Sequence, residues 1–340
     1  MINVKKIASI AALTLLIGVT PVYAAETVIN ANSGIGLYIP YGLADTEEGI
    51  LIADYQNNRL LKKTDTNVTV VAGKSSQIGG YIDGNATDAL FNGISDVAVN
   101  SKDEIFIADS ENNGIRKIDK SNKVITWSGS YTAGYVNGSR QETKYNQPMG
   151  IAIDNEDNIY VADTLNHVIR KIDANGASST LAGTPGKAGY ANGNVDSASF
   201  NEPTDVAVDK NGVIYVADSG NQCIRKIQGD TVTTIAGTPT IKDEANGYYT
   251  GGYVNGFSAQ FNFPRSITLL DNGEILVADT LNNAIRKVKT NGEVITVYDS
   301  ANGGIDEPVA VLYKNGKYYI SQRWCADLKI INEGMINNVK

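Results

Sequence analysis

The chain has 340 residues, of which 29 are lysine or arginine, 37 are aspartate or glutamate and one is histidine, and its net charge at pH 7 is −8. An acidic chain with dispersed lysines lacks the basic patch that binding to a phosphate backbone requires, so we expect no nucleic-acid partner. The single histidine excludes a zinc site with three histidine ligands within one chain.

The first 24 residues have the features of a secretory signal peptide. Two lysines precede an apolar run over residues 7–19, and the sequence PVYAA follows, which predicts cleavage near Ala24 or Ala25. The run is too short to cross a membrane comfortably, and no later stretch approaches about 20 apolar residues. We therefore expect residues 25–340 to be secreted, extracellular and not membrane-spanning. This part has 27 basic and 37 acidic residues, a net charge of −10.

The rest of the chain is built on a repeated phrase. The sequence NIYVADTLNHVIRKI, residues 158–172, has close copies that begin at Ile50, Glu104, Val213 and Glu274. A repeat with a nearly fixed period of 54 to 61 residues indicates one supersecondary unit per copy. The aspartates that the copies share are Asp54, Asp109, Asp163, Asp218 and Asp279.

Each copy is predicted to be a four-stranded antiparallel sheet. In the third copy, the segments 150–154, 158–163, 168–172 and 179–183 alternate in polarity or are rich in β-branched and aromatic residues. Their connections, DNEDN, DTLNH and DANGA, have the Asn, Asp and Gly of tight turns. No segment after the signal peptide shows a sustained helical period, so the fold class is all-β.

The sheets are predicted to surround a common axis, because both faces of each sheet carry apolar residues that must be covered. A sixth, degenerate copy begins at Lys317 and has Gln322 in place of the aspartate. Six sheets predict a six-bladed β-propeller that occupies residues 25–340 as one domain. For the last outer strand, the N-terminal segment ETVINAN competes with the C-terminal MINNVK, and we favour the N-terminal segment.

The phrases YVADTLNHVIRKI, TLAGTPGKAGYANG and FNEPTDVAVD resemble NHL repeats. The resemblance extends over essentially the whole mature chain, with five good copies, and in part includes secreted bacterial NHL-repeat proteins. It implies the propeller fold and leaves the function open.

The repeated polar residues are expected to be structural. Asp163 and Asn166 flank a tight turn, where their side chains can bond to backbone N–H groups. Arg170, on the next strand, can bond to a repeated aspartate of its own or a neighbouring blade. The first copy has Leu61 at this position, so the contact is predicted to be missing there. The arginines at this position are Arg116, Arg170, Arg225 and Arg286.

Aromatic residues recur in the loops between copies. We expect these rings to fill the seams between blades, and stacking on sugar rings is the alternative. The insertion TIKDEANGYYTGG interrupts the repeat and is the loop best suited to a specific contact. One aromatic position has Tyr81, Tyr135, Tyr190 and Tyr253, and the other has Phe91, Tyr145, Phe200 and Phe261.

Three weaker motifs favour structural interpretations. His167 stands in a turn where other copies have asparagine or glutamine. The sequence DGNATD, residues 83–88, has calcium-like oxygen spacing but no closing glutamate, so a simple loop is favoured. Cys223 and Cys325 fall in different copies and are not expected to form a disulfide.

A site is most expected where the repeat varies near the axis, at the start of the inner strands. The first position has Tyr41, Ser95, Met149, Thr204, Arg265 and Val309, and the next has Gly42, Asp96, Gly150, Asp205, Ser266 and Ala310. The candidate ligand-binding residues at this channel mouth are Tyr41, Asp96, Met149, Thr204, Asp205 and Arg265. A solvated pore is the structural alternative.

These observations favour a secreted, monomeric, non-catalytic module without a cofactor that binds an extracellular protein or glycan. The sequence has no GxSxG elbow and no conventional pair of nucleophile and base. The alternative is a metal-dependent lactonase, hydrolase or lyase, in which Asp96 and Asp205 hold a divalent ion such as calcium, in the manner of calcium-dependent lactonase propellers.

Overall fold

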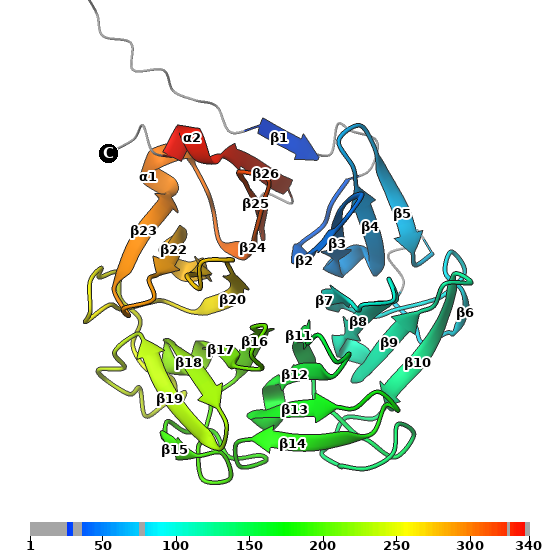
Figure 1. Ribbon diagram of the computed structural model, residues 1–340, viewed down its shortest axis with the longest axis horizontal. Helices are drawn as coiled ribbons and strands as arrows, with labels where there is room; N and C mark the ends of the chain where they lie inside the picture. The colour runs from blue at the N-terminus through cyan, green and yellow to red at the C-terminus, as the bar shows by residue number, and fades with distance from the viewer. Residues whose placement is uncertain (1–25, 30–35, 75–78, 325–326, 337–340) are drawn as a thin grey trace, which may run out of the picture.

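The computed structural model describes residues 26–29, 36–74, 79–324 and 327–336. They form six antiparallel sheets, arranged as blades around a central axis (Figure 1). The predicted six-bladed β-propeller is confirmed. Within the described ranges, no helix is long and apolar enough to cross a membrane.

The first three blades follow one another along the chain, each with its inner strand first. The first blade consists of β2 (Pro40–Thr46), β3 (Gly49–Asp54), β4 (Arg59–Lys63) and β5 (Val68–Ala72). The second consists of β7 (Ile94–Val99), β8 (Ile105–Asp109), β9 (Gly114–Ile118) and β10 (Lys123–Gly129). The third consists of β11 (Pro148–Ile153), β12 (Ile159–Asp163), β13 (Val168–Ile172) and β14 (Ser178–Ala182).

The remaining blades repeat this order. The fourth consists of β16 (Pro203–Val208), β17 (Ile214–Asp218), β18 (Cys223–Gln228) and β19 (Thr231–Ala236). The fifth consists of β20 (Pro264–Leu269), β21 (Ile275–Asp279), β22 (Ala284–Val288) and β23 (Val294–Asp299). The sixth contains β24 (Pro308–Lys314), β25 (Lys317–Gln322) and β26 (Asp327–Asn332). Cys223 is a buried free thiol in β18, and Cys325 lies outside the described residues.

Short elements decorate these sheets. The two-residue strands β6 (Gly84–Asn85) and β15 (Gly193–Asn194) pair outside β10 and β19, so blades 2 and 4 gain a fifth strand from the preceding loop. Two short helices, α1 (Ser300–Gly303) and α2 (Glu333–Ile336), lie on either side of blade 6 in the sequence. Five 3-10 turns connect second and third strands: η2 (Tyr55–Asn57), η3 (Ser110–Asn112), η4 (Thr164–Asn166), η5 (Ser219–Asn221) and η6 (Thr280–Asn282).

The N-terminal strand closes the ring, as the sequence predicted. Strand β1 (Glu26–Ile29) pairs antiparallel with β26, with Glu26 opposite Ile330, and so completes blade 6 from outside. The competing C-terminal segment begins in α2, where Met335 and Ile336 pack against the apolar cluster of blades 5 and 6.

The core lies in the seams between blades. In one seam, Leu51 and Leu60 of blade 1 pack with Ile107 and Ile118 of blade 2, around the fully buried ring of Phe91. Tyr145, Phe200 and Phe261 are likewise fully buried, each in the next seam along the ring. The expected seam-filling role of this aromatic position is confirmed.

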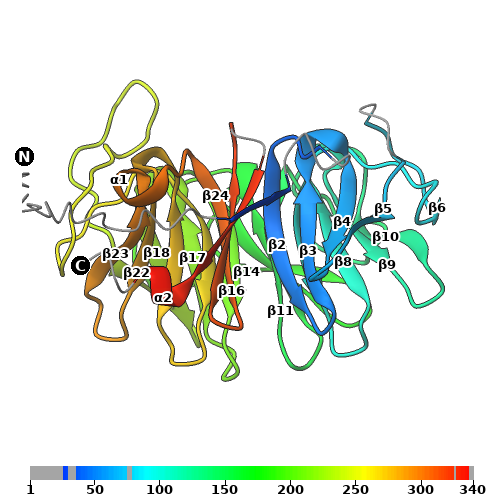
Figure 2. The same cartoon turned by 90° about the horizontal axis from the view of Figure 1, so that it is seen from above.

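The two sides of the propeller differ in their connections. Because successive strands are antiparallel, the loops between blades and the 3-10 turns emerge on the same side, which we call the loop face. The opposite side, the turn face, carries short hairpins. Figure 2 shows long loops on one side of the ring and tight turns on the other. The inter-blade loops of the loop face are 73–93, 130–147, 183–202, 237–263 and 300–307.

Candidate binding site at the channel mouth

The repeated aspartates are buried structural ties. Asp163 accepts a hydrogen bond at Oδ1 from the backbone N–H of Asn146, at 2.8 Å. At Oδ2 it accepts from Asn166 Nδ2 at 2.9 Å and from Arg170 Nη1 at 2.6 Å. Each aspartate therefore fixes the loop that enters its own blade, and the expected Asp–Arg contact forms within the blade. The same pattern joins Asp109 with Arg116, Asp218 with Arg225, and Asp279 with Arg286.

Each of these arginines also lies between two aromatic rings. The Arg170 Cζ atom is 4.9 Å from the ring centroids of both Tyr135 and Tyr145. The pairs of rings on the other three are Tyr81 and Phe91, Tyr190 and Phe200, and Tyr253 and Phe261. One face of each loop tyrosine is thus covered by a buried cation, which leaves only the other face for a ligand.

Blade 1 keeps the contact that was predicted to be missing. Arg59, not a residue at the Leu61 position, donates from Nε to Asp54 Oδ2 at 2.8 Å. The prediction was wrong because a side chain at the start of β4 reaches the same carboxylate from two residues earlier. In blade 6, Gln322 Oε1 accepts from the N–H of Asp306 at 2.8 Å, and Gln322 Nε2 donates to Asp327.

A second set of ties joins neighbouring blades at the end of each 3-10 turn. His167 has a left-handed backbone there, with φ of 57°, and its Nδ1 accepts from the N–H of Glu202 at 3.1 Å. Burial lowers the pKa of His167, and the nearby Glu202 acts in the opposite direction. The turn residue is therefore a neutral acceptor between blades 3 and 4. The equivalent acceptors are Asn58, Asn113, Gln222 and Asn283.

The five residues held by these acceptors, together with Ile39 before blade 1, form an outer ring around the channel mouth that sequence reasoning missed. Five of the six positions have a non-glycine residue with positive φ, a conformation that costs energy and persists only where contacts enforce it. The signal in the sequence that could have identified these positions is that five of the six residues directly precede the proline at which an inner strand starts. The five are Ile39, Gln147, Glu202, Phe263 and Glu307, and Gly93 holds the sixth position.

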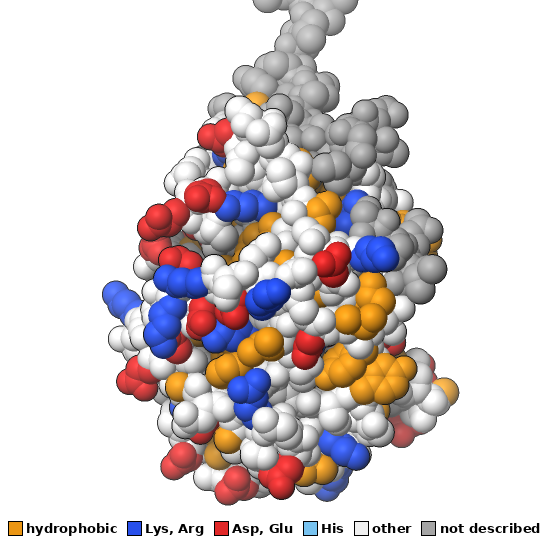
Figure 3. Space-filling model, turned by 90° about the vertical axis from the view of Figure 1, so that its right-hand side faces the viewer, with side chains coloured by type: hydrophobic (Ala, Val, Ile, Leu, Met, Phe, Trp, Pro, Cys, Tyr) orange, Lys and Arg blue, Asp and Glu red, His pale blue; other side chains and the backbone are white. Residues whose placement is uncertain are grey.

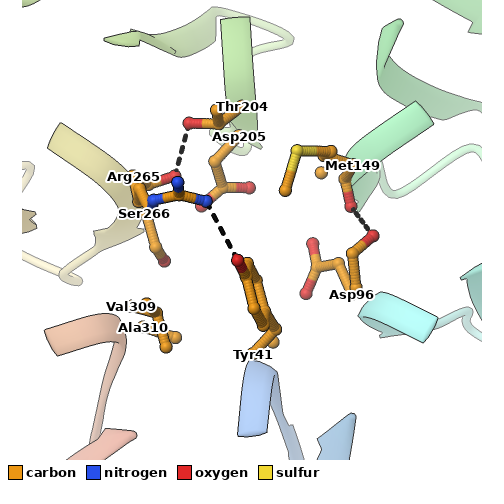
Figure 4. Close-up of a pocket in the computed structure, with 12 residues that line it drawn as sticks. Tyr41, Asp96, Met149, Thr204, Asp205, Arg265, Ser266, Val309 and Ala310 are labelled. Atoms are coloured by element: carbon orange, nitrogen blue, oxygen red, sulfur yellow. Dashed lines mark hydrogen bonds between the residues drawn. The ribbon is translucent and has the colours of Figure 1, made fainter. Parts of the chain in front are cut away.

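Inside this ring, all twelve of the variable inner-strand residues line a single pocket on the axis (Figure 4). The six candidate residues Tyr41, Asp96, Met149, Thr204, Asp205 and Arg265 are among them. The pocket has a cavity volume of about 20 Å³. This is room for about one water molecule or one ion, and a sugar ring does not fit.

Asp96 and Asp205 each accept a hydrogen bond from the next blade and lie close to a glycine of the preceding blade. Asp96 Oδ2 accepts from the N–H of Ile151 at 2.9 Å, and Asp205 Oδ2 accepts from the N–H of Ile267 at 2.8 Å. Space for Asp96 depends on Gly42, because a Cβ atom there would lie 2.1 Å from Asp96 Oδ1. These contacts make both carboxyl groups structural ties as well as pocket residues.

Both carboxyl groups bind their protons unusually tightly. Burial raises the pKa of Asp205 to about 7, against the opposing effect of its hydrogen bonds. Burial also raises the pKa of Asp96, and the nearby Asp205 raises it further. Both carboxyl groups therefore keep a proton to higher pH than an ordinary aspartate, and in the protonated form each can donate a hydrogen bond.

Two hydroxyl groups of the pocket, those of the candidate Thr204 and of the neighbouring position Ser95, already donate hydrogen bonds within the pocket wall. Thr204 Oγ1 donates to the backbone oxygen of Arg265 at 2.7 Å, and Ser95 Oγ donates to that of Met149 at 2.6 Å. Arg265 reaches across the mouth, where Nη1 donates to the Tyr41 hydroxyl at 3.1 Å (Figure 4). The hydroxyl groups thus hold the pocket wall, and the guanidinium is the polar group directed at the opening.

The pocket does not fit the calcium site of the metal-dependent alternative. One oxygen of Asp96 and both oxygens of Asp205 already accept a backbone N–H, and the Arg265 cation lines the same pocket. Across the described residues, no group of three or more His, Cys, Asp and Glu side chains is placed to hold a metal ion. Calcium requires six to eight oxygen ligands, mostly anionic or carbonyl.

Comparisons with known proteins agree with the architecture. Protein SUPPRESSOR OF QUENCHING 1, chloroplastic, of Arabidopsis thaliana is 36% identical over 134 residues, which are 36% of this chain and 13% of that protein. Teneurin-4 of Mus musculus is 26% identical over 314 residues, which are 80% of this chain and 11% of that protein. The chain therefore spans only 11–13% of the length of these two relatives.

Solved structures share the fold at low identity. A protein of unknown function from Bacteroides thetaiotaomicron has a TM-score of 0.64 at 14% identity, over 92% of this chain and 73% of the other. An auxiliary nutrient binding protein of the same species has a TM-score of 0.63 at 13% identity, over 88% and 70%. A gluconolactonase from Xanthomonas campestris has a TM-score of 0.59 at 11% identity, over 91% and 94%. These likenesses concern the fold alone.

The repeat itself identifies the family. Residues 91–118, 200–227 and 261–288 match the sequence profile of the NHL repeat, and each segment ends in the third strand of blade 2, 4 or 5. The resemblance seen in the sequence is thereby confirmed. The chain is an NHL-repeat β-propeller.

Proposed function

We propose that this propeller is a non-catalytic binding module that presents its loop face to an extracellular protein or glycan. The observation that carries the proposal is where large apolar side chains are exposed. All twelve such side chains among the described residues lie in the loops and turns that start from the loop face. Six of them, Ile82, Tyr135, Val136, Tyr253, Val254 and Phe257, lie where an inter-blade loop runs along the outer strand of the blade that it enters, and the other six lie at the loop face itself. They are Tyr38, Ile82, Tyr131, Tyr135, Val136, Leu165, Ile241, Tyr253, Val254, Phe257, Leu281 and Trp324.

Phe257 is the most exposed of these, at 72%, and three others that are more than 60% exposed lie at the loop face on different blades. Tyr131 is 63% exposed in the loop before blade 3, Ile241 is 66% exposed in the insertion before blade 5, and Trp324 is 61% exposed after β25. Exposed apolar side chains that gather on one side of a protein are typical of interaction surfaces. Loops held by a rigid scaffold are likewise typical positions for binding residues.

The charge distribution supports this class of partner over nucleic acid. Figure 3 shows acidic and basic side chains interspersed over one edge of the propeller, with no broad field of one sign. The extracellular address rests on the signal peptide expected at residues 1–24, which lies outside the described residues. The auxiliary nutrient binding protein that shares the fold supports a binding role by analogy only.

The proposal is tested by binding of the mature protein to arrays of glycans and of extracellular proteins. A triple variant, Tyr131→Ser, Ile241→Ser and Trp324→Ser, is expected to weaken the binding that the wild type shows by about tenfold or more, because buried aromatic and apolar side chains dominate interface energies. The control substitutes three residues of the turn face, Lys120→Ser, Lys210→Ser and Asn291→Ser. Equal loss in both triple variants would refute the assignment of binding to the loop face.

A hydrolase or lactonase is the second candidate, and one observation favours it. Asp205 has a pKa of about 7 in a pocket that opens on the loop face, as a general base requires. The cavity of about 20 Å³ opposes this function, because a lactone ring cannot enter it. Turnover of glucono-δ-lactone that requires Asp205, with or without added calcium, would replace the binding proposal with this one.

A further inference from the structure

Arg265 differs from the other arginines of the fold. The four arginines of the repeat each donate four hydrogen bonds and pair with a buried aspartate. In the described part of the chain, Arg265 donates only the bond to Tyr41 and forms no ion pair. A guanidinium has five N–H donors and is always charged, so Arg265 retains donors and a charge without an anionic partner.

Aromatic side chains flank this guanidinium on two sides. The Arg265 Cζ atom is 5.0 Å from the centroid of Phe263 and 5.7 Å from that of Tyr41. Tyr41 in turn lies 4.8 Å from Tyr55, and Phe263 lies 6.0 Å from Tyr248, between ring centroids. The cation is therefore surrounded by a half-buried aromatic border at the opening of the channel.

In each aromatic pair, the tyrosine farther from Arg265 donates a hydrogen bond to a glutamate. The Tyr55 hydroxyl donates to Glu111 Oε1 at 2.6 Å, and the Tyr248 hydroxyl donates to Glu202 Oε1 at 2.7 Å. These two carboxylates add negative charge around Arg265. An anion bound there must therefore carry little charge itself, because each further negative charge is repelled by the border.

We propose that Arg265 binds the carboxylate of a singly charged sugar acid, a uronic acid, whose ring lies over the aromatic border of the channel mouth. This inference rests on the proposed binding function of the loop face and names its ligand class. The planar guanidinium matches a carboxylate with two parallel hydrogen bonds. The pocket below admits only the carboxylate group, because its cavity of about 20 Å³ does not hold the sugar ring.

Two features select the uronic acid among anions. Asp205 and Asp96 line the same pocket, and because burial raises the pKa of both, their protonated forms can donate a hydrogen bond to a carboxylate. A phosphate ester carries nearly two negative charges at pH 7 and meets the repulsion of Glu111 and Glu202 more strongly. The rings of Tyr55 and Tyr248 supply the apolar surface on which a sugar ring can pack.

The test is calorimetric titration of the mature protein with three matched sugars, D-glucuronate, D-glucose and D-glucose 6-phosphate. Glucuronate is expected to bind about tenfold or more tightly than either of the other two, because a hydrogen bond to a charged group adds about that factor. Arg265→Gln is expected to remove the preference for glucuronate over glucose, and Arg265→Lys to retain a part of it. The matched control is Arg140→Gln, which removes an arginine that also stacks on a ring and forms no ion pair with a described residue.

The outcomes separate this inference from the function on which it rests. Unchanged glucuronate affinity in folded Arg265→Gln protein would overturn the assignment of the carboxylate to Arg265, whereas loop-face binding on the arrays would stand. Tighter binding of glucose 6-phosphate than of glucuronate would overturn the choice of a single charge. The absence of any glucuronate binding to the wild type would overturn the ligand class. If the arrays also gave no binding, the proposed function would fail as well.

Discussion

Arg265 of β20 and Tyr41 of β2 are joined by a hydrogen bond of 3.1 Å across the mouth of the channel, although blade 6 lies between their blades around the ring. Blade 6 places Val309 at the equivalent position, where no polar group competes for either partner. The contact thus connects blade 5 with blade 1 directly, next to the blade whose outer strand comes from the N-terminus.

Loss of this bond should weaken the closed ring. We expect Tyr41→Phe to lower the free energy of unfolding by about 1 kcal/mol, the usual value of a hydrogen bond between side chains. Urea denaturation followed by tryptophan fluorescence measures the change. Tyr131→Phe is the matched control, since the Tyr131 ring is 63% exposed. Equal effects of the two variants would show that the Arg265–Tyr41 bond contributes nothing to stability.

Arg59, the arginine that takes the place of the repeat arginine in blade 1, should contribute as much to the free energy of unfolding as the arginines of the other blades. Asp54 and Arg59 form a buried pair, so Arg59→Met leaves a carboxylate without its cation and should cost about 3–5 kcal/mol. The same denaturation assay applies. Arg140→Met, at the edge of the propeller, should cost less than about 1 kcal/mol. A loss at Arg59 no larger than at Arg140 would argue that blade 1 does not depend on this pair.

Residues at equivalent repeat positions were predictable, and contacts between different positions were not. Aligning six copies places Asp96, Asp205 and Arg265 on rings around the axis, because a propeller repeats each position once per blade. The role of Arg59 was missed because its reach depends on a side-chain conformation and not on the alignment. The outer ring with Glu202 was missed because its backbone conformation is imposed by a turn of the neighbouring blade.

His167 should make the stability of the propeller depend on pH. Burial lowers its pKa in the folded state, so the unfolded chain takes up a proton first as the pH falls below about 6.5. The contribution of neutral His167 is present above that pH and is lost as the pH falls towards its folded-state pKa.

The substitution His167→Asn should remove this pH dependence, because asparagine fills three of the equivalent positions. Unfolding free energies of the two proteins should agree within about 0.5 kcal/mol at pH 7.5. At pH 5 the variant should be the more stable. All carboxyl groups are common to both proteins, so the difference isolates the imidazole. A difference that does not change with pH would contradict the assignment of His167 as a neutral acceptor.

Asp205 should have the opposite dependence. Its pKa of about 7 in the folded state lies above the ordinary value of 3.8, so its contribution is full at low pH and is lost as the pH rises through about 7. Asp205→Asn stays neutral and keeps an oxygen that can accept the N–H of Ile267. We expect the variant to be more stable than the wild type at pH 8, with the advantage shrinking towards pH 4. A wild type that is more stable at pH 8 would show that the carboxylate is stabilised there by a partner.

Metal analysis of the dialysed mature protein tests whether a divalent ion binds to the Asp205 carboxylate. The pocket is lined by two aspartates, by the Arg265 cation and by hydroxyl groups that already donate to backbone oxygens. We therefore expect a content of divalent ions far below one per chain. We also expect the same melting temperature with and without chelator. A ligand that binds only the folded state must stabilise it. A near-stoichiometric ion whose removal lowers the melting temperature would instead favour metal-assisted hydrolysis. The double variant with Asp96→Ala and Asp205→Ala would then lose the ion. In that case Arg265 would have to turn away from the pocket.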